Sequence, residues 1–139
     1  DFEKHKGQQS LIRDLNHLYR NEPALYEADY ERSGFMWLDH NDYEHSVYAM
    51  LRRNKAADRT MLVVGNFTPT PIDGYRLGVP EAGTYQVVLN SDSSYYWGSD
   101  YDMGGLSFPS DTIAVHGQAQ SILINLPPLA TVFIKRVGD

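Results

Sequence analysis

The chain has 139 residues, no cysteine, and 12 Lys and Arg against 18 Asp and Glu, which gives a formal net charge of -6. This length suits one domain of ordinary size, and the lack of cysteine excludes thiol catalysis, iron–sulfur clusters and cysteine-based zinc sites. No Lys or Arg occurs from Leu77 to Ile134, and no apolar run approaches the roughly 18 residues of a membrane-spanning helix, so neither nucleic acid nor a membrane is an expected partner.

The first predicted element is an amphipathic helix. Its apolar stripe recurs at helical spacing and consists of Leu11, Ile12, Leu15, Leu18 and Tyr19. Ser10 is the expected N-cap and Asn21 the expected stop. The proline at position 23 ends the helix, because proline disfavours a helical conformation in the residue before it.

After Gly34 the pattern changes to short alternating or apolar runs separated by turn residues, which is typical of a β-sandwich or barrel. Seven to eight strands are predicted, at residues 35–39, 47–51, 61–64, 75–79, 84–89, 112–115, 120–126 and 130–137. No later stretch is convincingly helical, so the crossovers that a parallel sheet needs are missing. We therefore expect antiparallel pairing.

Two of these segments indicate where the core lies. Residues 61–64 form an unbroken apolar run, typical of a strand buried on both faces, and we expect it at the centre of a sheet. Alternation in the segment before it places two sets of side chains on opposite faces, with Val47, Ala49 and Leu51 on one face and Tyr48 and Met50 on the other.

The long connection at residues 90–111 is unusual, because loops beyond roughly 12–15 residues in a compact domain tend to be functional or disordered. It carries four aromatic side chains, Tyr95, Tyr96, Trp97 and Tyr101. Tyrosine and tryptophan combine a flat apolar face with a polar tip, which suits sugar rings and protein interfaces alike. Three interpretations stay open: contact with a glucan, packing against another domain, and packing of the loop on its own core.

Other candidate chemistry is weaker. Paired carboxylates for glycoside cleavage could be drawn from the acidic turns, at Asp39 with Asp42 or Glu44, or at Asp100 with Asp102, but solvated turn residues are the better interpretation. The five histidines are scattered without metal-ligand spacing, so neither a metal nor a cofactor is predicted. Asn66-Phe67-Thr68 is a formal glycosylation sequon, interpreted as a strand end that runs into a turn.

A series of short segments forms a recognisable pattern in one order along residues 7–136. In one-letter code they are LYRNEPAL at 18–25, GFMWLD at 34–39, NFTP at 66–69, GYRLGVP at 74–80, LNSD at 89–92, YY at 95–96 and LPPLA at 126–130. Together they resemble the C-terminal part of bacterial glycogen branching enzymes, which belong to the alpha-amylase superfamily. One departure is that residues 97–102 replace the family's Gly-Gly-Ser-type loop and enlarge the aromatic surface with Trp97 and Tyr101.

The resemblance implies a fold and a division of the chain. Residues 1–29 correspond to the last helix of a missing (β/α)8 catalytic barrel plus a connector, and residues 30–139 to the C-terminal domain. That domain is expected to be an all-β, Greek-key-like antiparallel β-sandwich of the alpha-amylase C-terminal type, preceded by one amphipathic N-terminal helix.

The resemblance also implies a role. The parent enzyme moves α-1,4-glucan segments to a 6-hydroxyl in the cytoplasm, using barrel carboxylates that are absent here, so no catalytic residue is assigned and the chain alone is expected to be inactive. The sandwich is expected to stabilise the barrel of the same parent chain. The residues expected to face the barrel are Leu11, Ile12, Leu15, Leu18 and Tyr19, and those expected to contact α-glucan are Tyr95, Tyr96, Trp97 and Tyr101.

Three alternatives accompany this interpretation. Without a barrel, the apolar face of the helix is expected to dock on its own sandwich or to drive self-association. A rival function is a free-standing carbohydrate-binding module that acts through the 90–111 loop. An autonomous hydrolase using Asp39 and Glu44 is the least favoured.

Overall fold

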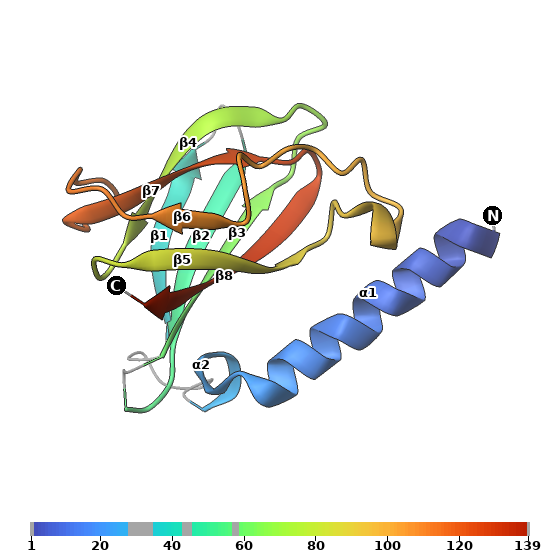
Figure 1. Ribbon diagram of the computed structural model, residues 1–139, viewed down its shortest axis with the longest axis horizontal. Helices are drawn as coiled ribbons and strands as arrows, with labels where there is room; N and C mark the ends of the chain where they lie inside the picture. The colour runs from blue at the N-terminus through green and yellow to red at the C-terminus, as the bar shows by residue number, and fades with distance from the viewer. Residues whose placement is uncertain (1, 28–34, 43–45, 57–58, 139) are drawn as a thin grey trace.

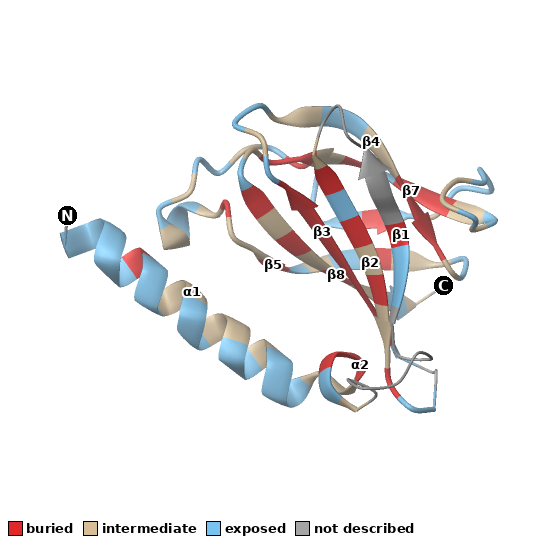
Figure 2. Ribbon diagram, turned by 180° about the vertical axis from the view of Figure 1, so that it is seen from behind, coloured by how far each residue is buried: buried red, intermediate tan, exposed pale blue. Residues whose placement is uncertain are grey.

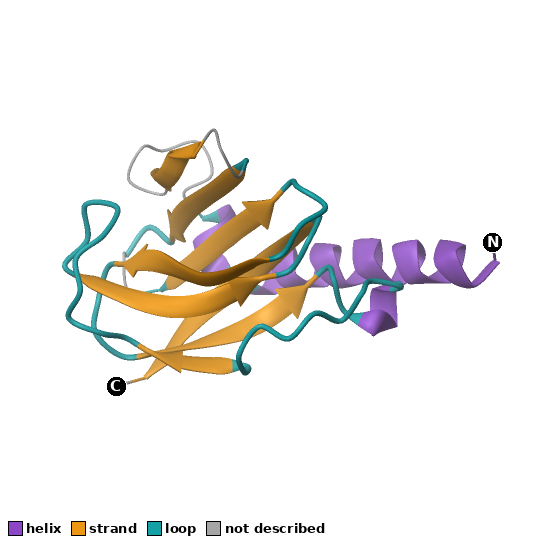
Figure 3. Ribbon diagram, turned by 90° about the horizontal axis from the view of Figure 1, so that it is seen from above, coloured by secondary structure: helices purple, strands orange, loops and turns teal. Residues whose placement is uncertain are grey.

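The computed structural model describes residues 2–27, 35–42, 46–56 and 59–138, with the backbone alone described at position 35 and at 39–42. Two antiparallel sheets form a sandwich, and a long helix runs along one side of it and continues beyond the strands (Figure 1 and Figure 3). The helices are α1 (Phe2–Asn21), α2 (Pro23–Tyr26) and the 3-10 turn η2 (Ser94–Tyr96). The strands are β1 (Phe35–Asp42), β2 (Val47–Arg53), β3 (Thr60–Asn66), β4 (Ile72–Val79), β5 (Thr84–Asn90), β6 (Ser107–Pro109), β7 (Gln120–Leu126) and β8 (Ala130–Gly138).

The larger sheet has the strand order β1-β2-β3-β8-β5-β6, and the smaller sheet pairs β4 with β7. Every pair of strands is antiparallel, as predicted. The chain crosses between the sheets at β4, while β8 inserts between β3 and β5. All seven residues of β3 are buried, and the prediction of a central, two-faced buried strand at 61–64 is confirmed.

The core fills the space between the two sheets. Alternation along β2 is confirmed, since Val47, Ala49 and Leu51 are buried while Tyr48 is exposed. The inner faces of the other strands add the largest fully buried side chains, among them Tyr85, Leu62, Leu77, Ile122, Ile124 and Ile134. Burying each such side chain contributes about 1.5–3 kcal/mol, so this cluster supplies most of the stability that holds the surface features in place.

Two predictions about the loops were wrong. Residues 112–115 are not a strand; isolated bridges join only Asp111 to Ser121 and Val115 to Gln118. Ile113 is 47% exposed. The alternating apolar residues of this segment therefore do not pack as a strand of either sheet. Conversely, the 90–111 connection is not uniformly irregular, because it contains η2 and the edge strand β6. Pro109 ends β6, which suits an edge position that needs no further donor.

The helix begins earlier than predicted. Ser10 lies in the interior of α1 and is not its N-cap, because helical structure extends back to Phe2. The predicted stop at Asn21 is confirmed, and Pro23 opens α2 in the first helical position, where its missing N–H costs nothing. The apolar stripe that predicts the helix begins only at Leu11, so the periodicity does not record the turns before it.

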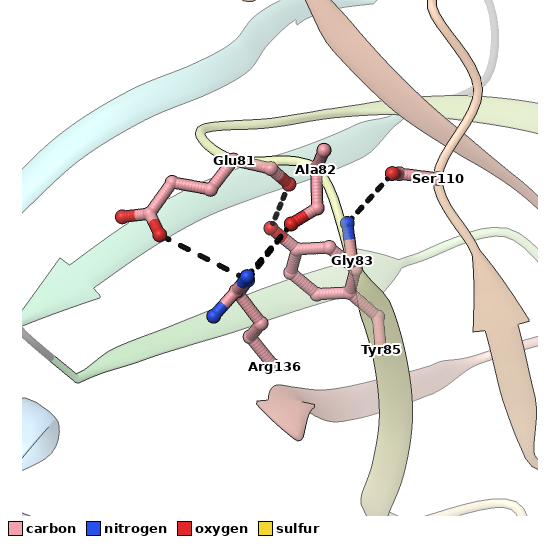
Figure 4. Close-up of polar contacts among 6 residues, drawn as sticks. All are labelled: Glu81, Ala82, Gly83, Tyr85, Ser110 and Arg136. Carbon is pink, nitrogen blue, oxygen red and sulfur yellow. Dashed lines mark hydrogen bonds and ion pairs between the residues drawn. The ribbon is translucent and has the colours of Figure 1, made fainter. Parts of the chain in front are cut away.

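Polar contacts fasten the β4–β5 turn to the end of β8 (Figure 4). The Arg136 guanidinium donates two hydrogen bonds to the Ala82 carbonyl, at 3.0 and 2.9 Å, and lies 3.8 Å from the Glu81 carboxylate. The buried Tyr85 hydroxyl donates to the Glu81 carbonyl at 2.7 Å. Burial raises the pKa of this phenol above its ordinary value. These contacts close the end of the sandwich farthest from the aromatic loop.

Candidate interaction surfaces

The aromatic loop contacts helix α1. Gly7 is the only buried residue that α1 has among the described residues (Figure 2), because the loop backbone passes directly over it. A Cβ at this position would lie 2.9 Å from the Tyr96 carbonyl carbon and oxygen and 3.2 Å from Trp97 Cδ1. Such distances are shorter than van der Waals contact, so glycine is what allows the helix and the loop to approach.

Two hydrogen bonds flank this close approach. Arg13 donates to the Tyr95 hydroxyl at 2.9 Å, and the Tyr96 hydroxyl donates to the Asp14 carboxylate at 2.6 Å. Partial burial and the Asp14 carboxylate raise the pKa of Tyr96 well above its ordinary value, because both disfavour the phenolate. The two tyrosine rings meet edge to face, with centroids 5.2 Å apart. We call Gly7, Arg13, Asp14 and their partners Tyr95–Trp97 the helix–loop contact.

Asp92 builds the loop that presents these aromatics. Its buried carboxylate accepts hydrogen bonds from the Ser99 backbone and hydroxyl, at 2.9 and 2.8 Å, and from the Tyr101 backbone at 2.8 Å. Its own carbonyl accepts from the Asp100 backbone at 2.7 Å. These hydrogen bonds satisfy the buried carboxylate and hold the backbone between positions 92 and 101 in one conformation. The backbone that carries the aromatic side chains is therefore ordered.

The structure therefore separates the four predicted glucan-contact residues. Tyr95, Tyr96 and Trp97 lie together on the side of the loop that faces α1. Tyr101 lies apart from them, and its hydroxyl donates to the Asp73 carboxylate at 2.5 Å. Packing against a neighbouring helix is thus one use of the first three, and glucan contact stays a prediction for the set.

At its other end, α1 meets the outer face of the larger sheet. Leu18 packs with α2 residues Ala24 and Leu25 against Met61 and Val63 of β3. The Lys135 ammonium of β8 donates to the Glu22 carboxylate at 2.9 Å. The helix is consequently held to the sandwich at two separate points.

The five residues expected to face a barrel divide between two environments. Leu18 packs on the sheet as described, and Leu11 and Leu15 are half-buried. Ile12 and Tyr19 stay 59% and 45% exposed, and Tyr19 lies beside Tyr26, with ring centroids 6.5 Å apart. Docking of the helix on its own sandwich is what the structure shows, while a contact of Ile12 and Tyr19 with a barrel stays a prediction.

An exposed apolar surface on the larger sheet was not predicted as a site. Trp37, Tyr48 and Phe67 form a row of rings, with successive centroids 6.2 and 5.6 Å apart. They line a groove of about 370 Å³ whose walls are almost wholly apolar. Met50 and Val63 connect it to a second groove of about 350 Å³ that reaches Leu15 and Tyr19 of the helix. We call these two grooves the outer-face grooves.

One sequence signal could have found this surface. The alternation predicts Tyr48 and Met50 on the face of their strand opposite Val47, Ala49 and Leu51. Large apolar side chains on both faces of a strand indicate that each face has a contact surface. Trp37 and Phe67 could not be added from sequence, because Trp37 belongs to a different strand and Phe67 to the loop after β3, and only the fold brings them beside Tyr48.

The acidic residues offer little chemistry. One oxygen of Asp100 accepts from the Ser94 backbone at 3.4 Å, and one of Asp102 from the Gly104 backbone at 2.8 Å, which are turn-stabilising roles. The side chains of Asp39 and Glu44 lie outside the described residues. Within the described ranges no three His, Asp or Glu side chains gather as metal ligands, and no helix is long and apolar enough to cross a membrane.

Comparison with known proteins gives a consistent answer. The family model of the alpha-amylase C-terminal all-beta domain matches residues 37–137. Proteins named 1,4-alpha-glucan branching enzyme GlgB are 46% identical over 139 residues in Pseudoalteromonas atlantica and 52% identical over 135 residues in Pseudomonas fluorescens. The matches cover 100% and 96% of this chain but 19% and 18% of those proteins. The chain thus spans about a fifth of the length of these curated relatives.

Two further similarities extend this result. The branching enzyme of Aquifex aeolicus is 42% identical over 139 residues, covering 99% of this chain and 22% of that protein. The crystal structure of an alpha-amylase from H. orenii superposes with a TM-score of 0.53 at 16% identity, over 92% of this chain and 20% of the other. The second likeness concerns the fold alone.

Proposed function

The chain belongs to the alpha-amylase C-terminal all-beta domain family, and we propose that it works as the non-catalytic C-terminal domain of a 1,4-alpha-glucan branching enzyme. In this proposal the parent protein moves α-1,4-glucan segments to a 6-hydroxyl, and its catalytic carboxylates lie on a (β/α)8 barrel. Residues 1–29 are the last barrel helix and its connector. The domain stabilises the barrel by holding that helix.

The two-point attachment of α1 carries the proposal. One side of the helix is fixed to the sandwich through Gly7 and Leu18. Ile12 stays exposed on another side, and Tyr19 stays 45% exposed at the edge of the groove between helix and sheet. A helix of an outer barrel ring needs two such sides, one toward its barrel and one toward the domain that covers it. Large exposed apolar side chains on the second side support a further packing partner.

The outer-face grooves support a wider contact surface. The groove that reaches Leu15 and Tyr19 adjoins the C-terminal half of α1, and the groove beside Tyr48 continues from it along the sheet. The lining of the second is almost wholly apolar. Such a lining suits apolar side chains of a protein better than a hydrated polymer, because a buried polar ligand group needs a hydrogen-bond partner. In the parent protein, barrel residues next to the helix would fill the outer-face grooves.

The test uses the longer protein that carries this sequence. Branching is followed as conversion of amylose to α-1,6-branched product without release of reducing sugar, and thermal stability by calorimetry. We expect Ile12→Glu combined with Tyr19→Glu to lower the unfolding temperature and the activity together, since each buried apolar side chain contributes about 1.5–3 kcal/mol. The 139-residue chain alone is expected to produce no branches.

Leu123→Glu is the matched control. Leu123 is 48% exposed on β7, in the smaller sheet away from the helix, and the same change there should leave both readouts near wild type. Equal effects at Leu123 and at the helix positions would overturn the placement of the interface. Branching by the chain alone, or a longer protein without branching activity, would overturn the functional assignment. Light scattering of the isolated chain, with and without the two glutamates, would show whether self-association uses the same surface.

A further inference from the structure

A third groove opens beside the aromatic loop, between the C-terminal half of β5 and the loop itself. Its volume is about 270 Å³, and its lining includes Val88, Ser93, Tyr95, Tyr96, Asp100 and Leu106. Small-molecule sites begin at about 300 Å³, so a groove of this size suits a short piece of a polymer. It combines apolar walls with carboxylate, hydroxyl and amide groups.

The apolar part of the groove is exposed, and its aromatic ring is restrained by neighbours. Tyr95 is 61% exposed and Leu106 70%. The Tyr95 ring is fixed from two directions, because its hydroxyl accepts from Arg13 at 2.9 Å and its neighbour Tyr96 meets it edge to face. A ring that is already ordered loses little conformational freedom on binding. It therefore offers a stacking surface to the C–H face of a sugar ring.

The polar part of the groove has hydrogen-bonding capacity left over. One Asp100 oxygen accepts from the Ser94 backbone, and the other has no partner among the residues that the structure describes. The Ser93 hydroxyl oxygen accepts from the Tyr95 backbone at 3.2 Å, and its hydrogen stays available for donation. A carboxylate acceptor and a hydroxyl donor beside an aromatic ring match the hydroxyl pattern of a neutral sugar.

Charge points the same way. The groove lining contains the Asp100 carboxylate and no Lys or Arg, and the Arg13 guanidinium that reaches Tyr95 is paired with Asp14 at 3.5 Å, so the local charge does not favour an anionic ligand. We propose that this groove binds one or two glucose rings of an α-1,4-glucan. The identity of the sugar rests on the proposed function, whereas the groove and its chemistry do not.

The test is a titration of the 139-residue chain with maltoheptaose, followed by two-dimensional amide NMR. The expected result is binding at millimolar ligand, with shifts at Ser93, Tyr95, Asp100 and Leu106. Tyr95→Ala and Asp100→Asn should each weaken binding roughly tenfold, which corresponds to about 1.4 kcal/mol. Asparagine tolerates the positive φ of 58° at position 100, so the second variant keeps the loop fold.

Two further variants separate stacking from helix docking. Tyr95→Phe keeps the ring but loses the Arg13 hydrogen bond that holds it, and its affinity should fall between those of wild type and Tyr95→Ala. Tyr101→Phe removes the Asp73 contact outside the groove and is the control that should bind like wild type. No amide shifts at millimolar maltoheptaose, or equal affinity of wild type, Tyr95→Ala and Asp100→Asn, would overturn the groove. That failure would leave the helix-interface test in the longer protein unaffected, so the two proposals can fail separately.

Discussion

Single residues decide how the loops of this domain close. Gly83 and Asp92 occupy positions that few other side chains could fill. Gly83 has a φ of 148° and its N–H donates to the Ser110 hydroxyl at 2.9 Å. Asp92 supplies acceptors to three backbone or hydroxyl donors within the next nine residues. Both are conformational requirements of turns, which explains why neither was singled out as a site from sequence.

Gly83→Ala is expected to destabilise the domain by about 2 kcal/mol. A Cβ there would collide with the Gly138 carbonyl oxygen, and only glycine adopts this φ without strain. Urea denaturation provides the measurement. Gly74→Ala is the control, since its φ of 67° carries strain but no atom lies within 4 Å of the added carbon. A larger loss for Gly74→Ala than for Gly83→Ala would contradict this account.

Asp92→Ala is expected to cost about 3 kcal/mol, because it removes the buried carboxylate that accepts three hydrogen bonds from the backbone and hydroxyl of Ser99 and the backbone of Tyr101. Near-ultraviolet circular dichroism should lose the signal of the ordered loop aromatics before the sheets unfold. Asp102→Ala serves as a comparison, since Asp102 is exposed and accepts one bond from the Gly104 backbone. Similar losses from both variants would argue against a central role for Asp92.

Among the elements, α1 depends most on contacts outside itself. Its helix–loop contact joins residues 82 positions apart in the chain, and no local pattern reveals such a pairing. Sequence periodicity found the helix and its end, but it assigned one apolar face. The structure shows that Gly7 and Asp14 share the sandwich side with Leu18, so part of the true contact face is not apolar at all.

Gly7→Ala tests the helix–loop contact, because the contact decides whether the substitution raises or lowers the free energy of unfolding. Alanine stabilises a helix interior by about 1 kcal/mol relative to glycine, so a free helix would gain stability. Here the new methyl would press on the Tyr96 backbone, and we expect a net loss of about 1 kcal/mol or more. Chemical denaturation of Gly7→Ala and of the exposed Gln8→Ala compares the two situations. A gain for Gly7→Ala would show that helix and loop do not touch.

The stability of the helix–loop contact should fall at alkaline pH. The pKa of Tyr96 is raised in the folded state by partial burial and by Asp14, so the contribution is complete below the ordinary tyrosine pKa of about 10 and is lost as pH rises above it. Unfolding free energies from pH 8 to 11 would show the decline. Tyr96→Phe should flatten part of it and cost about 1 kcal/mol at neutral pH. An unchanged slope in Tyr96→Phe would contradict this assignment.

For the whole molecule, sequence predicted the sandwich well and its surfaces poorly. The strand at 120–126 was predicted with its observed limits, and 61–64 was placed correctly at the sheet centre. These strands could be predicted because a half-buried strand alternates apolar and polar residues, and a strand buried on both faces is a continuous apolar run. Residues 112–115, predicted as a strand, have only isolated bridges around them, whereas β6, which was not predicted, pairs with β5. The aromatic row of Trp37, Tyr48 and Phe67 likewise depends on three segments meeting in space.

Hydrogen exchange should show two levels of amide protection, one in the larger sheet and a lower one at the start of α1. Amides of β3 and β8, inside the larger sheet, should exchange only through global unfolding. Amides near the start of α1 should exchange much faster, since Gly7 is its only buried residue in the described chain. Mass spectrometry of time-resolved exchange measures both. Protection of residues 2–10 equal to that of β3 would contradict this picture.

The two anchors of α1 also fix an angle. Gly7 and Leu18 lie eleven residues apart, about 16 Å along the helix axis, and each is held to a different part of the sandwich. One anchor would permit the helix to swing like a hinge, whereas two remove that rotational freedom. Whatever is rigidly joined to this helix inherits a set orientation relative to the sheets, and loosening either anchor would convert a fixed junction into a swivelling one.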